Sequence, residues 1–210
     1  MQKEKRVAEY YVLCNKLKNV IRTGWKDWNV KKERLESVAE HIYGTQMLAI
    51  AMKSEYEYDI DILKVIFMLA VHELEEIYIG DLTLFQISKE EKTKIGHEAV
   101  AQILSGLIKG EQIYEVIKEF DERKTKEAIF AYYVDKLECD IQCKLYDEEN
   151  RVDLSKQQNN KTYNDEDVKR LLKTGKSWSG MWLEFGREKY NYDENFSAVS
   201  KYVETHKITK

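Results

Sequence analysis

The chain has 210 residues, of which 43% are hydrophobic and 34% charged, and its net charge is −4. This balance is typical of a soluble globular protein with a substantial core. The sequence has no basic stripe, which argues against nucleic acid as the main partner. We find no run of about 18 apolar residues and no apolar segment behind the N-terminus, so we expect neither a membrane-spanning helix nor a signal peptide.

Cysteine and proline usage narrow the class of protein further. Three cysteines, an odd number, indicate reduced thiols and a cytoplasmic location. Cys139 and Cys143 are four residues apart on a predicted helix, but without a second pair we interpret them as packing residues. There is no proline, where average usage would give about ten. This composition favours long helices joined by short loops.

Helical spacing dominates the first half of the chain. The first predicted helix covers residues 6–22 and stops at Thr23-Gly24, and residues 25–34 are expected to form a loop. Ser37 and Glu40 form a capping box that opens a helix with His41 on its inner face. The next helix is predicted over residues 60–77, and its apolar stripe continues into His72 and Glu76.

The second half continues the helical pattern. A capping box at 88–91 opens a helix predicted over 89–108, followed by helices over 111–120 and 124–148, the last with Asp135 in its inner seam. We predict an all-α fold: one compact helical bundle spanning residues 1–210, with a core at 8–150, a polar loop at 151–164 and a C-terminal helical cap at 165–205. The aromatic residues of that cap are also a hint of a dimer surface.

The most unusual stretch is Val71 to Asp81, where a histidine and four carboxylates follow an apolar run. Burying these groups unpaired would cost several kcal/mol each. A lone inward histidine is more often a hydrogen-bonded core residue, and an acidic helix end is more often solvated. A bound cation is favoured because several histidines and carboxylates occupy inward positions together.

Four polar side chains fall on inner faces of three predicted helices: His41, His72, Glu73 and Asp135. Two imidazoles and two carboxylates suit one divalent ion, such as Mn, Co, Fe, Ni or Zn, and Mg less well. Such a set leaves room for a metal-bound water, which a hydrolytic site needs. Glu76 and Asp81 follow closely and are expected to handle protons.

His72-Glu73 also begins the H-E-x-x-H helix of zinc proteases, but position 76 is glutamate. The second ligand histidine of that motif is missing. We therefore set a zinc protease aside.

The motif set resembles the HD-domain metal-dependent phosphohydrolases, and within them the 5'-deoxynucleotidase-like branch. The family pattern H…HD…D is matched by His41, His72-Glu73 and Asp135. Four segments also resemble those of the branch: Glu36–His41, His72–Asp81, Val134–Glu138, and Arg22 with Gly24-Trp25. The departure is Glu73, where the family has aspartate; the extra methylene shifts the carboxylate by about 1.5 Å and can alter metal preference.

The resemblance implies roles for these residues. His41, His72, Glu73 and Asp135 would hold one divalent ion, and Arg22 would bind the phosphate. Trp25 would border the sugar or base, or simply pack. Glu76 and Asp81 would orient the attacking water and protonate the leaving 5' oxygen, without an assignment of which does which. Lys136 is expected to pair with a carboxylate rather than with phosphate.

The expected activity is removal of phosphate from (deoxy)nucleoside 5'-monophosphates by a cytoplasmic enzyme. Its relatives lead us to expect a homodimer. A first alternative is another phosphorylated nucleotide as substrate: a triphosphate, a cyclic nucleotide or an alarmone. The few positive charges argue against such highly anionic compounds. A second alternative is a non-catalytic metal-binding helical protein, but such a protein has little use for Glu76 and Asp81 beside the metal. The preferred base, sugar and metal stay open.

Overall fold

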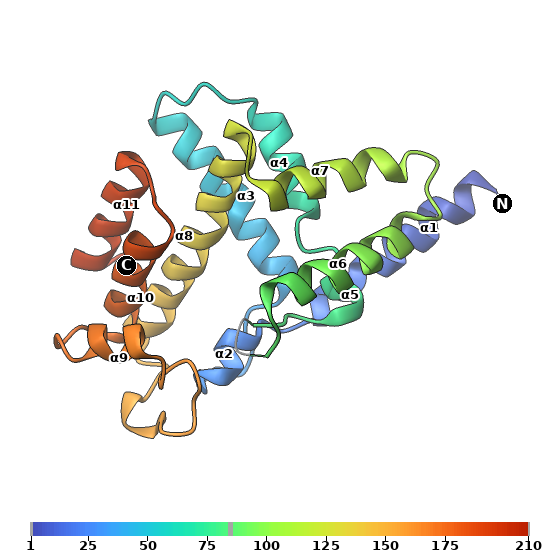
Figure 1. The fold of residues 1–210 in the computed structure, drawn as a ribbon. Helices are drawn as coiled ribbons and strands as arrows, with labels where there is room; N and C mark the ends of the chain where they lie inside the picture. The colour runs from blue at the N-terminus through green and yellow to red at the C-terminus, as the bar shows by residue number, and fades with distance from the viewer. Residues whose placement is uncertain (1, 84–85, 210) are drawn as a thin grey trace. The chain divides into compact units, whose positions relative to one another are not determined.

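The computed structural model describes residues 2–83 and 86–209. Within these ranges the regular structure is helical, and an isolated antiparallel bridge joins Ile21 to Ser37 (Figure 1). The all-α prediction is therefore confirmed. No helix in the described ranges is both long enough and apolar enough to cross a membrane.

The chain divides into two compact units. The first comprises residues 1–23 and 36–132, and the second comprises residues 24–35 and 133–210. The long helix α8 (Lys126–Glu148) begins in the first unit and continues without a break into the second. That the whole chain folds as one domain stays a prediction.

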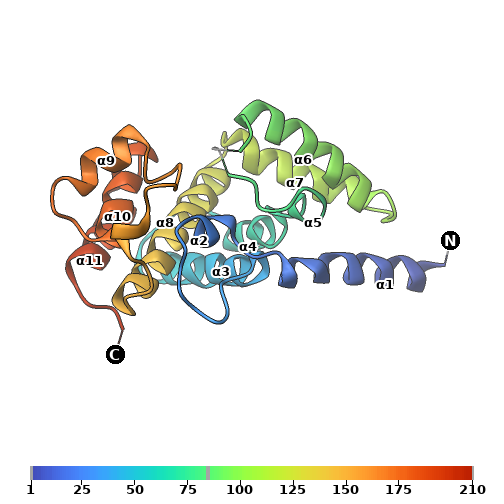
Figure 2. The same cartoon turned by 90° about the horizontal axis from the view of Figure 1, so that it is seen from below.

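In its described part, the first unit contains six α-helices that lie wholly within it and one 3-10 helix. They are α1 (Lys3–Cys14), η1 (Asn15–Asn19), α3 (Val38–Glu55), α4 (Ile62–Val71), α5 (Glu76–Ile79), α6 (Lys89–Leu104) and α7 (Gly110–Glu122). Helices α3 and α4 pack against each other, and α6 lies beside α7 in both views (Figures 1 and 2). Their shared apolar core includes Val38, Val71, Leu74, Val100 and Ile103.

The start of the chain differs from the prediction of one helix over 6–22. The α-helix ends at Cys14, a 3-10 turn follows to Asn19, and Val20 is extended. The carbonyl of Val20 accepts from the amide of Val38 at 2.8 Å, and the amide of Arg22 donates to the carbonyl of Glu36 at 3.1 Å. Since these backbone groups pair with a distant segment, they are not available to an α-helix. The predicted loop over 25–34 is also partly wrong, because α2 spans Thr23–Asp27.

Helix α3 begins where the capping box predicted it. The Ser37 hydroxyl accepts from the amide of Glu40 at 3.3 Å, and the Glu40 carboxylate accepts from the amide of Ser37 at 2.9 Å. This cap fixes the rotational phase of the helix. The buried face consequently carries His41, as well as Thr45 and Ala49.

The helix predicted over 60–77 is interrupted. Helix α4 ends at Val71, residues 72–75 form a tight turn, and α5 begins at Glu76. The amide of Leu74 donates to the carbonyl of Val71, and the amide of Glu76 donates to that of Glu73, each at 3.2 Å. These bonds span three residues rather than four, so the chain is wound more tightly here than in an α-helix.

The later helices follow the predictions closely. Helix α6 ends four residues earlier than expected, at Leu104 rather than 108, and α7 and α8 match the predicted helices to within two residues. The Ser88 hydroxyl accepts from the amide of Glu91 at 3.2 Å, as its predicted capping role requires.

The second unit contains most of α8 with η2 (Leu154–Lys156), α9 (Glu166–Leu172), α10 (Trp178–Lys189) and α11 (Glu194–Thr205). Helices α9, α10 and α11 occupy the region that was predicted as a C-terminal helical cap. Their aromatic residues mostly face inward: Trp178 is 1% exposed and contacts the rings of Trp25 and Trp28. Tyr202, at 59% exposed, is an exception. The aromatic segment therefore forms the core of this unit, which removes it as an argument for a dimer surface.

The polar segment predicted as a loop carries a fixed set of hydrogen bonds. The side-chain amide of Gln157, 1% exposed, donates to the carbonyls of Trp28 and Asp153 at 3.0 and 3.1 Å. The Asn160 amide donates to the Gln157 oxygen at 3.1 Å. These contacts hold the loop against residues 24–35 of the same unit.

Glu148 at the end of α8 predicts a pH dependence of stability. Burial alone would raise its pKa, but donors from Thr209 and Ile208 outweigh burial and lower that pKa to about 2. Since the folded pKa is depressed, the stabilisation is present above the ordinary pKa of about 4.3 and is lost as pH falls toward 2. We expect Glu148→Gln to lower the urea midpoint at pH 7 and to lower it less at pH 3. An equal difference at both pH values would contradict this account.

Candidate metal centre

His41 is placed by the first complete turn of α3. Its side chain is fully buried, and its ring lies 5.6 Å from that of His72, measured between ring centres. Two imidazole rings at this separation can both coordinate one metal ion. The prediction that His41 lies on an inner face is confirmed.

His72 caps the C-terminal end of α4, where the helix leaves carbonyl groups without intrahelical donors. Its Nδ1 lies 2.8 Å from the carbonyl oxygen of Leu69. Because a carbonyl can only accept, Nδ1 carries the hydrogen, and the lone pair of the neutral ring is on Nε2. A metal-binding histidine usually donates a hydrogen bond from its other ring nitrogen to a carboxylate, a backbone carbonyl or water, which fixes the tautomer and the orientation of the ring.

Glu73 brings a carboxylate to the same point. Its Oε1 lies 3.6 Å from Nε2 of His72 and 3.9 Å from Nε2 of His41. The same oxygen lies 3.4 Å from Nη1 of Arg22. The extra methylene relative to aspartate therefore does not keep this side chain away from the two imidazoles.

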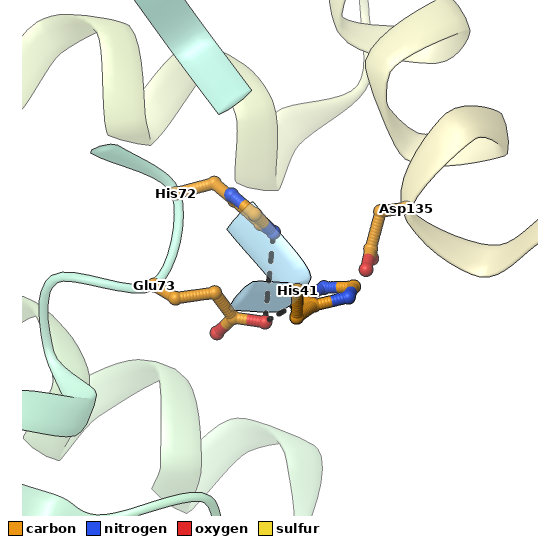
Figure 3. Close-up of side chains that lie close together, drawn as sticks. All are labelled: His41, His72, Glu73 and Asp135. Atoms are coloured by element: carbon orange, nitrogen blue, oxygen red, sulfur yellow. Dashed lines mark ion pairs between the residues drawn. The ribbon is translucent and has the colours of Figure 1, made fainter. Parts of the chain in front are cut away.

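Asp135 lies on α8, where the helix has just entered the second unit, and is 3% exposed. Its Oδ2 pairs with Nζ of Lys136 at 2.8 Å, as predicted for that lysine. His41, His72, Glu73 and Asp135 each offer one ligand atom, and these atoms all lie within 4.8 Å of one another. Figure 3 shows the four side chains pointing toward one another.

The donor set fits a divalent ion. Metal–nitrogen and metal–oxygen bonds in such sites are about 2.0–2.2 Å long, so ligand atoms on opposite sides of one ion are about 4 Å apart. The observed spread of 4.8 Å needs only a small closure around an ion. Two nitrogens and two carboxylate oxygens also leave coordination positions for water or substrate.

The carboxyl groups that follow His72 lie close to one another in a largely buried place. Glu76 is 1% exposed; burial, together with Glu73 and Asp81, raises its pKa to about 10. Burial and the neighbouring Glu73 also raise the pKa of Glu75 to about 8. Since burial and like charges both disfavour the ionised form, a nearby cation would stabilise this group of acids.

Asp81 is anchored to the segment that carries Arg22. Its Oδ2 accepts from the amide of Thr23 at 2.6 Å and lies 3.9 Å from Nε of Arg22. The Thr23 hydroxyl donates to the Asp81 carbonyl at 2.5 Å. Asp81 thus supports the start of α2 and holds the predicted phosphate-binding arginine beside Glu73.

The backbone conformation of Gly80 allows Asp81 to be anchored in this way, and it leads to a prediction about stability. Its φ of 72° and ψ of 173° belong to a region that is essentially restricted to glycine. An added Cβ would meet no atom within 4 Å, so the cost of Gly80→Ala is backbone strain, about 1–3 kcal/mol of unfolding free energy. Urea denaturation measures it. Gly106→Ala, equally uncrowded and without a positive φ, is the control and should change stability little.

Arg22 and Trp25 are close in sequence but belong to different units. Arg22 is within reach of Glu73 and Asp81, as described above. Trp25 is 7% exposed and packs edge-to-face on Tyr146 at 5.3 Å between ring centres. The packing alternative for Trp25 therefore describes its position here, and a contact with substrate stays a prediction.

Lys92 on α6 is a neighbour of these acids that the sequence reading missed. Its Nζ lies 3.0 Å from the carbonyl oxygen of Leu82 and 3.4 Å from Oε1 of Glu76. A signal was present: the stripe Ile95, Ala99 and Ile103 continues three residues back to Lys92. The same extension of an apolar stripe predicts the inward position of His72 directly after α4.

Comparison with known proteins places the chain in a class. The family model of the HD domain matches residues 14–178, so the chain belongs to the HD domain family.

Within this family the similar proteins are nucleotidases. Over 150 residues the chain is 35% identical to 5'-deoxynucleotidase HDDC2 of Dictyostelium discoideum, covering 67% of this chain and 77% of that protein. It is 30% identical over 145 residues to 5'-deoxynucleotidase HDDC2 of Homo sapiens, covering 68% and 69%. The predicted membership of the 5'-deoxynucleotidase-like branch is confirmed.

Solved structures share the fold. A predicted metal-dependent phosphohydrolase from Magnetospirillum magnetotacticum MS-1 aligns with a TM-score of 0.64 at 19% identity, covering 96% of this chain and 90% of the other. The PH0347 protein from Pyrococcus horikoshii OT3 aligns with a TM-score of 0.62 at 22% identity, covering 91% and 99%. At these identities the likeness speaks for the fold alone.

Proposed function

We propose that this protein is a metal-dependent phosphomonoesterase that removes the phosphate from (deoxy)nucleoside 5'-monophosphates. The observation that carries the proposal is the group His41, His72, Glu73 and Asp135, whose ligand atoms lie within 4.8 Å of one another. The names of the similar proteins, 5'-deoxynucleotidases, support the substrate class.

The four residues of this group would hold the ion. A bound divalent ion makes water acidic enough to act near neutral pH and polarises a phosphoryl oxygen. Arg22 would bind the phosphate, because its planar guanidinium can donate to two oxygens at once. Its contacts with Glu73 and Asp81 hold it beside the ligand group before substrate arrives.

Glu76 is our choice for the group that transfers a proton to the leaving 5' oxygen. Its Oε2 is buried and accepts no hydrogen bond from the residues that the structure describes. Oδ2 of Asp81 already accepts a short bond from the Thr23 amide. Asp81 would then act mainly by anchoring Arg22 and orienting water.

The finer parts of the proposal are a single metal ion per chain, a cytoplasmic location, a homodimer and no nucleic-acid partner. Light scattering after size exclusion measures the oligomeric state. Metal content of protein purified without chelator measures the number and kind of ions.

The activity is tested with a substrate panel. Phosphate release from dAMP, dGMP, AMP and para-nitrophenyl phosphate, with added Mn or Co, is expected, and monophosphates should be preferred over dATP. Asp135→Ala should lose metal and activity while its helical circular dichroism is retained. Absence of both bound metal and phosphate release in the wild type would overturn the proposal, and faster hydrolysis of dATP would change the substrate.

A further inference from the structure

Lys92 is a cation surrounded by the acids of the site. It lies one turn into α6, where Ser88 caps the helix, and its side chain is 25% exposed. Glu73, Glu76, Glu75 and Asp81 all act on it electrostatically. A lysine so placed on the inner face of a helix has little packing value, since its ammonium group must be compensated.

Two contacts fix the ammonium group. The carbonyl of Leu82 accepts from Nζ at 3.0 Å, and Oε1 of Glu76 lies 3.4 Å from the same nitrogen. Leu82 directly follows Asp81, so the lysine contacts Glu76 and the backbone of the residue next to Asp81. An ammonium group has three donors, and these contacts use two of them.

The two oxygens of Glu76 are thereby made unequal. Oε1 is held by Lys92, whereas Oε2 is buried and has no hydrogen-bond partner among the described residues. A carboxyl group that is tethered through one oxygen presents the other in a defined direction. Such orientation is what efficient proton transfer requires.

We propose that Lys92 is a positioning residue, which holds Glu76 through Oε1 so that Oε2 is aimed for proton transfer. The proposal rests on the proposed function, because it depends on the role given there to Glu76. It adds a residue that belongs to none of the motifs of the sequence. Lys92 acts through Glu76 and neither binds the metal ion nor contacts the phosphate.

The central variant is Lys92→Met, which keeps the length and apolar part of the side chain and removes the charge. We expect kcat to fall by about tenfold or more, within the range of proton-transfer effects, while KM stays within about twofold. Metal content and thermal midpoint should stay close to those of the wild type. Lys92→Arg, which can donate to both partners, should recover most of kcat. Lys94→Met, exposed two residues along the same helix, is the matched control and should behave as the wild type.

A double-mutant cycle tests whether Lys92 acts through Glu76. Glu76→Gln with Lys92→Met should be little slower than Glu76→Gln alone, because the second change removes support for a group that no longer functions. If Lys92→Met disturbs the helical signal, Lys92→Gln replaces it, with the same expectation.

Three results would overturn the proposal while leaving the proposed function intact. They are an unchanged kcat in both uncharged variants, a raised KM with unchanged kcat, and effects of the two substitutions that multiply. The raised KM would make Lys92 a substrate-binding residue. A wild-type protein that binds metal but releases no phosphate from any monophosphate would overturn both proposals.

Discussion

Replacing His72 with alanine is expected to abolish metal binding and to lower phosphate release by about 100-fold or more. Metal-ion stabilisation of a phosphoryl transition state is worth several kcal/mol, and each 1.4 kcal/mol, roughly, is a factor of ten in rate. Nε2 of His72 lies 3.6 Å from Oε1 of Glu73, so the substitution removes a ligand atom from the middle of the group of four ligands. Metal analysis and phosphate release measure the two effects.

The control for this experiment is His206→Ala, which removes an exposed histidine on the C-terminal side of α11. It should keep full metal content and activity. Circular dichroism of His72→Ala should retain the helical signal, because His72 follows the last residue of α4 and its hydrogen bond to the Leu69 carbonyl lies at the end of that helix. If His72→Ala keeps its metal, then His72 is a core residue that caps its helix, and the ligand set must be redrawn.

Replacing Glu76 with glutamine is expected to separate catalysis from metal binding. The amide has nearly the same shape and can still accept from Lys92, but it cannot transfer a proton. We expect kcat to fall by about 100- to 10,000-fold with metal content unchanged. Steady-state kinetics beside metal analysis measures this. Glu98→Gln, exposed on α6, is the matched control.

Two outcomes would contradict the role given to Glu76. Full activity of Glu76→Gln would move proton transfer to Asp81 or to water. Loss of metal would make Glu76 a ligand rather than a proton handler. Because this carboxyl group is 1% exposed and has one oxygen without a hydrogen bond among the described residues, the substitution probes the site and not the surface.

Local signals were enough to predict the placement of His41 and His72. The capping box at Ser37 sets the phase of α3, and a helix of known phase has a known inner face. The apolar stripe of α4 continues to His72 in the same way. Both predictions depend only on the few neighbouring residues, so they can be made from the sequence alone.

Contacts between distant segments could not be predicted in this way. The pairing of Ile21 with Ser37 replaces the last turn of the expected first helix, and Thr23 meets Asp81 across 58 residues. Whether Trp178 is exposed or buried depends on where Trp25 and Trp28 lie, far earlier in the chain. Lys92 was missed because a charged residue at a helix start is ordinarily solvated.

The turn at residues 72–75 has a consequence for how ligands can be supplied by adjacent residues. In an uninterrupted α-helix, neighbouring side chains point about 100° apart, so two consecutive residues cannot both face one small ion easily. Ending α4 at Val71 frees His72 and Glu73 from that constraint, and their ligand atoms come within 3.6 Å. Inserting a single alanine between Glu73 and Glu76 should therefore leave His72-Glu73 intact while it turns Glu76 of α5 away, which would separate the metal ligands from the proposed proton-transfer group.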